Sequence, residues 1–121
     1  MEKLPPVRHV IILGQLYRIE VTNDLSDEEL GRCETTDQRL MINQRQGACS
    51  IRDTVLHEIS HALTYLMNLH DDATEEDFVS RFSTGIRSVF IENKVLREWI
   101  FTAPYEEIKK GEVLPSPVIG D

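Results

Sequence analysis

The chain has 121 residues, of which 40% are hydrophobic and 28% charged, so we expect one globular domain over residues 1–121. Thirteen Lys and Arg against 21 Asp and Glu give a net charge of −8, which disfavours nonspecific binding to nucleic acids or membranes. No apolar run approaches the roughly 18 residues of a membrane span, and residues 1–6 lack the apolar region of a secretory signal. These features predict a cytoplasmic protein. The prolines predict a loose lead-in at 1–6, held extended by Pro5-Pro6, and a loose tail at 111–121 that is extended or mobile.

The first part of the chain has the composition of a small sheet. β-Branched residues are frequent in 7–13 and 16–22, and Gly14-Gln15 between these segments fits a two-residue hairpin turn. The polar, acidic stretch 25–36 predicts either one short helix or an ordered loop. The short apolar run 39–43 predicts a third strand, so we expect a small antiparallel sheet.

The second part of the chain predicts three helices. Ser50 is a suitable N-cap for a helix over 50–69, in which apolar residues recur at helical spacing. Thr74 is expected to cap a second helix over 75–92, which has its own apolar stripe. Asn93 is expected to cap a third, shorter helix that ends near Phe101. The predicted class is therefore α+β.

The first predicted helix contains the sequence His57-Glu58-Ile59-Ser60-His61, an H-E-x-x-H motif. Residues four apart lie one turn apart on the same helix face, so both imidazoles can ligate one Zn²⁺ at about 2.0–2.1 Å. Glu58 projects about 100° further around the helix. There its carboxylate can take a proton from a water in the open metal position, which makes it the candidate general base.

The two histidines lie on nearly the opposite helix face from the apolar residues. One interpretation is a pair of solvated histidines on an exposed face. The interpretation that we favour places the helix between the sheet and the 75–92 helix, which packs on its other side. A zinc ion between the two helices would then explain why His57 and His61 lie in a buried interface.

A catalytic zinc usually has three protein ligands and one water, so a third ligand is needed. The acids at the start of the second helix are the candidates, because a short turn brings this start toward the end of the first helix. Asp77 faces away from the apolar stripe, Glu76 lies at its edge and Glu75 lies near its centre. The pattern therefore leaves Glu75 and Glu76 open, and acids here also stabilise a helix through its dipole.

The two cysteines, Cys33 and Cys49, are expected to be reduced thiols in a chain without an export signal. Two cysteines cannot form a zinc site of four thiolates. A rival interpretation is a structural zinc closed by a fourth ligand, such as His70 or one cysteine. Glu58 argues against this interpretation, because a structural site needs no acid at that position.

Four stretches carry a resemblance to a known family. The segment Thr54–Leu63 resembles the active-site helix of small zinc metallopeptidases of phages and prophages, in the zincin superfamily, and is more distantly similar to peptidases of the ImmA/IrrE type. The resemblance covers residues 7–100. Three further segments are similar to that family's hairpin, its loop and strand before the active helix, and its third-ligand segment: Val10–Val21, Gly31–Cys33 with Arg39–Asn43, and Glu76–Ser83.

This resemblance implies a minimal zincin fold and zinc-dependent hydrolysis of a protein or peptide substrate. It assigns the third zinc ligand to Glu76, beside His57 and His61, and makes Glu58 the general base and later the proton donor. It also implies that the strand 39–43 is an edge to which the substrate adds as a further strand. A residue that stabilises the oxyanion is expected as well. The candidates are Tyr65, His70, Tyr105 and Arg39.

A second function from another class is compatible with the composition. An acidic, phage-type protein could bind zinc and act as an inhibitor or binder of a host factor, by charge mimicry and without catalysis. The two functions differ in their need for Glu58. Loss of function in a Glu58→Gln variant would favour catalysis, and retention would favour binding.

Overall fold

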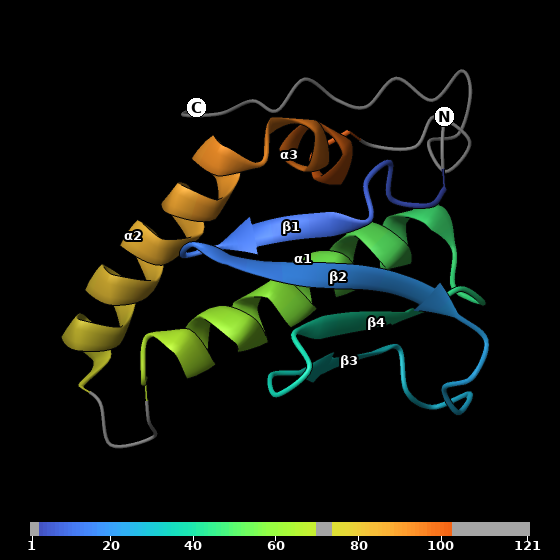
Figure 1. Cartoon of the computed structure of the whole chain (residues 1–121), viewed down its shortest axis with the longest axis horizontal. Helices are drawn as coiled ribbons and strands as arrows, with labels where there is room; N and C mark the ends of the chain where they lie inside the picture. Colours follow the sequence, from blue (N-terminus) through green and yellow to red (C-terminus); the bar gives the residue numbers. More distant parts are fainter. Residues whose placement is uncertain (1–2, 70–73, 103–121) are drawn as a thin grey trace, which may run out of the picture.

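The computed structural model describes residues 3–69 and 74–102 and has an α+β architecture. A four-stranded sheet in the order β1-β2-β4-β3 lies against the long helix α1, while α2 packs beside β1 and α3 packs on α1 (Figure 1). The strands are β1 (His9–Ile12), β2 (Gln15–Thr22), β3 (Gly31–Glu34) and β4 (Arg39–Asn43). The helices are α1 (Ala48–Leu66), α2 (Glu75–Glu92) and α3 (Lys94–Ile100).

The sheet is mixed, so the prediction of an antiparallel sheet is wrong. The pairs β1–β2 and β3–β4 are antiparallel, but the central pair β2–β4 is parallel. The reason is that β3 and β4 form their own hairpin, and β4 enters the sheet between β2 and β3. This pairing is non-local, and hydrophobic patterns within single segments carry no information about it.

Two local features of the sheet differ from the sequence prediction. The β1–β2 turn is Leu13-Gly14, with φ angles of 50° and 80°, one residue earlier than predicted. Two successive positive φ angles are typical of the tight turns that match the twist of a hairpin. The stretch 25–36 contains the strand β3, not a helix. The loop before β3 is held by Asn43, whose side-chain amide donates hydrogen bonds to the carbonyl oxygens of Ser26 and Glu29.

The three helices are confirmed, with corrections at the ends of α1. This helix begins at Ala48 after Gly47, and the Ser50 hydroxyl donates to the side chain of Gln46 instead of capping the helix. It ends at Leu66, three residues before the predicted end. The α2 prediction is accurate, because the Thr74 side chain accepts a hydrogen bond from the backbone of Asp77. Within the described residues, no helix is long and apolar enough to cross a bilayer.

The core lies between the sheet and α1, and it fixes which face of α1 remains free. Fully buried side chains of this size each contribute about 1.5–3 kcal/mol of burial free energy. The core residues on the sheet are Val10, Ile12, Tyr17, Ile19, Leu40 and Ile42, and those on α1 are Ile51, Val55, Ile59, Ala62 and Leu63. His57 and His61 are turned away from this core and are exposed.

A buried arginine joins α1 to α3. The Arg52 guanidinium donates to the carbonyl oxygens of Trp99 and Ala48, at 2.9 Å each, and lies 4.4 Å from the centre of the Trp99 ring. A guanidinium that is hydrogen-bonded and stacked on an indole stabilises the contact between the helices. This contact fixes the start of α1, about two and a half turns before His57.

Candidate metal centre

The two histidines of the motif converge on one point. The Nε2 atoms of His57 and His61 lie 3.0 Å apart, and the two rings meet edge to face with centroids 4.6 Å apart. Both residues belong to α1, and the four-residue spacing places them one above the other. The two nitrogens that can bind a metal therefore point at each other on an exposed helix face.

This geometry fits a tetrahedral zinc ion. Two imidazole nitrogens bound at about 2.0–2.1 Å with a tetrahedral angle lie about 3.3 Å apart. The observed 3.0 Å differs from that by a few tenths of an ångström, which a small rotation of either side chain supplies. Neutral imidazole is also a preferred zinc ligand.

Glu58 lies beside the two histidines but is buried. Its side chain is 4% exposed, and with His57 and His61 it lines a cavity of about 390 Å³ between α1 and β3. Burial raises the pKa of the Glu58 carboxyl, the histidine charges lower it, and Glu29 adds a smaller increase. No donor in the described part of the chain bonds to this carboxylate, so it is an acceptor facing the cavity.

Gly31 on β3 allows Glu58 to lie this close to the sheet. A Cβ on Gly31 would lie 2.6 Å from Cγ2 of Thr54 and 2.9 Å from Oε2 of Glu58, closer than side-chain atoms approach. Thr54 is itself fixed, because its hydroxyl donates to Gln46. The sequence analysis placed Gly31 and Thr54 in segments that resemble the metallopeptidase family, but it did not predict the contacts of Gly31 with Thr54 and Glu58, because Gly31 is distant from both in the chain.

Cys33 follows Gly31 on β3 and lines the same cavity. Burial, with smaller contributions from the charges of Glu58 and Glu34, raises the pKa of its thiol to about 11. Cys49 is exposed at the start of α1, and neither cysteine forms a disulfide within the described residues. On β2, the hydroxyl of Tyr17 is buried without a hydrogen-bond partner among the described residues, and burial raises its pKa.

The site lies between α1 and β3, so the predicted position between α1 and α2 is wrong. Where α2 meets α1, Gly85 packs against Leu63 and Met67, and the Arg81 side chain donates to the Met67 carbonyl oxygen. This contact lies in the C-terminal part of α1 and begins about half a turn after His61. The histidine face is open to solvent instead of being covered by α2.

The predicted third ligand is not assembled with the histidines. Glu75, Glu76 and Asp77 are all exposed in the first turn of α2. Among residues 3–69 and 74–102, no three His, Cys, Asp or Glu side chains form a group that could hold a metal ion. His70, the alternative fourth ligand of a structural site, lies outside the described residues. The assignment of Glu76 therefore stays a prediction.

The oxyanion candidates fall into three groups. Arg39 is turned away from the site, where its guanidinium bonds to Glu34 and Glu20. Tyr65 lies one turn after His61 on the same exposed face of α1 and is 61% exposed. The two other candidates, His70 and Tyr105, lie outside the described residues.

The prediction that the strand 39–43 is an edge strand is wrong. β4, at 39–43, lies between β2 and β3, so it has no free edge. The edge strand at this end of the sheet is β3, which lines the cavity with His57 and Glu58.

Comparison with known proteins adds no relative: no family model, curated protein or solved structure matches the chain.

Proposed function

We propose that the protein is a zinc-dependent peptide hydrolase with a zincin-like site, in which His57 and His61 hold the metal and Glu58 is the general base. One observation carries this proposal. The two Nε2 atoms lie 3.0 Å apart, and the buried Glu58 carboxylate faces the cavity that both histidines line. An Nε2–H···Nε2 hydrogen bond between two solvated histidines would give the same spacing, but such a pair does not need the buried acid beside it.

The residues of the chain have separate parts in this reaction. Zinc, when bound, would polarise the scissile carbonyl and lower the pKa of a coordinated water. Glu58 would accept the proton of the attacking water and return it to the leaving amine. Its place on the cavity beside both histidines suits both steps, because a general base must lie within reach of the proton that it accepts. The third ligand is predicted to be Glu76, brought from the start of α2.

The open edge of β3 supports a substrate bound in extended form. The backbone N–H of Asn43 donates to Leu30, and hydrogen bonds to β4 alternate along an antiparallel strand. Residues 30, 32 and 34 therefore face β4, and the N–H and C=O groups of Gly31 and Cys33 face outward. A peptide that pairs with these groups would pass the cavity that Glu58 and the histidines line.

The first test is metal content, measured by mass spectrometry of the untagged full chain and of single variants. About one zinc per chain is expected, lost in His57→Ala and retained in Glu58→Gln and in His9→Ala, a histidine on β1 far from the site. Loss of zinc in Glu76→Ala but not in Glu75→Ala would identify the third ligand. No bound metal after zinc is supplied would overturn the proposal.

The second test is cleavage of a mixture of unstructured peptides, followed by mass spectrometry. Glu58→Gln should lower the rate by about 10²–10⁴ while zinc stays bound, because general base catalysis has this magnitude. Glu92→Gln at the exposed end of α2 is the matched control. A zinc-loaded Glu58→Gln variant with the rate of the original chain would contradict the role of Glu58. Bound zinc without cleavage by the original chain would favour the acidic binder.

A further inference from the structure

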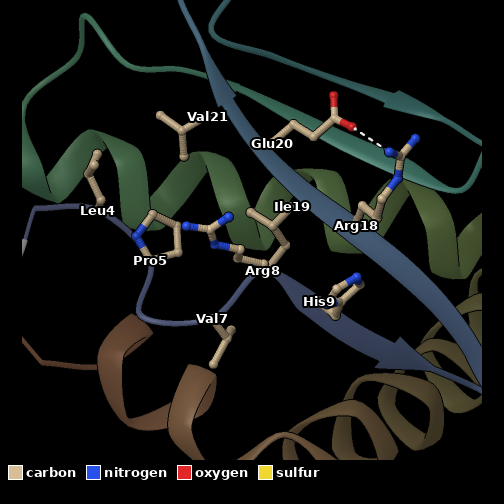
Figure 2. Close-up of a pocket in the computed structure, with 9 residues that line it drawn as sticks. All are labelled: Leu4, Pro5, Val7, Arg8, His9, Arg18, Ile19, Glu20 and Val21. Carbon is tan, nitrogen blue, oxygen red and sulfur yellow. Dashed lines mark ion pairs between the residues drawn. The ribbon is translucent and has the colours of Figure 1, made fainter.

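A second cavity, of about 550 Å³, lies between the segment before β1 and the strand β2, and neither His57 nor His61 lines it (Figure 2). Its walls combine the N-terminal lead-in with β2. Leu4 and Pro5 of the lead-in form one apolar wall together with Val7, which follows it. β2 supplies the other apolar wall, with Ile19 and Val21. Charged side chains complete the lining: Arg8, His9, Arg18 and Glu20.

The cavity lies at an edge of β2 that β1 does not cover. Alternate residues of β2 belong to opposite faces of the sheet, yet both Ile19 and Glu20 line the cavity, so it opens around the strand's edge. β1 pairs only with residues 15–18 of β2. Pro5 and Pro6 have no N–H to donate, so the lead-in cannot continue the ladder.

The backbone of Val21 points into this opening. The backbone N–H of Arg18 donates to the carbonyl oxygen of Gln38, and the backbone N–H of Gln44 donates to the carbonyl oxygen of Thr22. The even-numbered residues of β2 therefore form their backbone hydrogen bonds toward β4. Ile19 bonds the other way, to the Arg8 carbonyl oxygen, and hydrogen bonding alternates along the strand. The N–H and C=O groups of Val21 therefore face the lead-in, from which no hydrogen bond to them comes within the described residues.

Arg8 places a positive charge in the same opening. Figure 2 shows its guanidinium turned back along Pro5, on the side of the cavity where Leu4 and Val21 lie. Arg18 is neutralised by Glu20 at 3.2 Å, and Glu20 also pairs with Arg39. The Arg8 side chain has no hydrogen bond or ion pair with any described residue.

We propose that this cavity binds a carboxylate attached to an apolar body, such as the free C-terminus of a peptide or a medium-chain fatty acid. One carboxylate oxygen would accept from the Val21 N–H and the other from the Arg8 guanidinium. The apolar body would fill the space between Leu4, Val7 and Ile19. A cavity of this size with apolar walls and a few convergent donors has the usual composition of a small-ligand site. The site is independent of the proposed hydrolysis.

The test is an NMR titration of the isotope-labelled full chain with octanoate, with octanol, and with a short apolar peptide as its free acid and as its amide. Octanoate or the peptide acid should shift the Val21 amide resonance, and octanol and the peptide amide should not. Arg8→Gln should weaken binding about tenfold or more, while Arg87→Gln, at an exposed residue of α2 outside the cavity lining, should change it less than about twofold.

The ligand arms identify the source of the carboxylate. Binding of the peptide acid but not octanoate would assign the site to chain termini, and the reverse result would assign it to fatty acids. Binding of both would support the shared chemistry. An unshifted Val21 resonance in every arm, or equal affinity of the original chain and Arg8→Gln, would overturn the proposal.

Discussion

The two edges of the sheet differ in whether their outward backbone N–H and C=O groups have hydrogen-bond partners. At the β1 edge, the Asn93 side chain accepts from the Ile11 N–H at 2.9 Å and donates to the Ile11 carbonyl oxygen at 2.8 Å, as a neighbouring strand would. At the β3 edge, the outward backbone groups of Gly31 and Cys33 have no such partner among the described residues. An exposed edge promotes unwanted pairing, so natural proteins usually cover it. Of the two outer strands of the sheet, the uncovered one is β3, beside the cavity that His57 lines.

This difference indicates that the two edges serve separate purposes. The β1 edge joins the sheet to the α2–α3 corner, where Asn93 also bonds to the Val89 carbonyl oxygen. The β3 edge leaves room for a ligand strand along the cavity of Glu58. Changes at β3 should therefore affect the candidate metal centre as well as stability, whereas changes at the contact of Asn93 with β1 should affect stability but not the metal centre.

The largest effect is expected from Gly31→Ala at the open edge. The added Cβ would lie 2.6 Å from Thr54 and 2.9 Å from the Glu58 carboxylate, so the free energy of unfolding should fall by about 2–3 kcal/mol. The carboxylate should also swing away from β3, because it is at the end of a flexible side chain. Urea unfolding measures the first effect, and peptide cleavage measures the second.

A double-mutant cycle separates these two contacts. Thr54→Ser removes the clashing methyl group and keeps the hydroxyl that donates to Gln46. In that background, Gly31→Ala should destabilise the protein much less, but the loss of cleavage should persist because the contact with Glu58 remains. Equal destabilisation by Gly31→Ala in both backgrounds would show that the Thr54 contact is not the cause.

At the closed edge, Asn93→Ala should lower the free energy of unfolding by about 1–2 kcal/mol, because it leaves the Ile11 N–H and C=O without partners. The Ile11 amide should also exchange with solvent faster, as measured by NMR. Zinc content and cleavage should not change. Asn93→Asp, which keeps an acceptor for the N–H, should lose less protection at Ile11. A fall in zinc content with Asn93→Ala would break the contrast between the edges.

The parts of the molecule that sequence predicted are those determined by nearby residues. The spacing of His57 and His61 fixes their convergence once α1 forms, and Thr74 caps α2 as its residue type and position suggest. These features depend on contacts within four residues. For the same reason, the core face of α1 follows from the helical period of its apolar residues.

The parts that sequence missed depend on contacts between distant residues. Nothing in the local pattern of Gly31–Glu34 distinguishes an edge strand from a loop, and the parallel pairing of β2 with β4 is set by how two hairpins join. The position of the site against β3 follows from that pairing. The close approach of Glu58 to Gly31 involves residues 27 apart in the chain, which no periodicity can reveal.

The smallest expected effect is a change in the free energy of unfolding with pH, which tests whether Glu58 is buried beside the open β3 edge. Because burial raises the pKa of this carboxyl in the folded chain, the folded state holds a proton over a pH range in which the unfolded state has released it. In metal-free protein, stability should therefore fall as the pH rises from the unfolded pKa, about 4.3, through the higher folded pKa. In the Glu58→Gln variant the side chain at this position does not ionise. The variant should therefore match the original chain in stability at low pH and be the more stable of the two near neutrality. Urea unfolding of both proteins across this range measures the difference. A difference that does not change with pH would mean that the Glu58 carboxylate is as well solvated as in the unfolded chain.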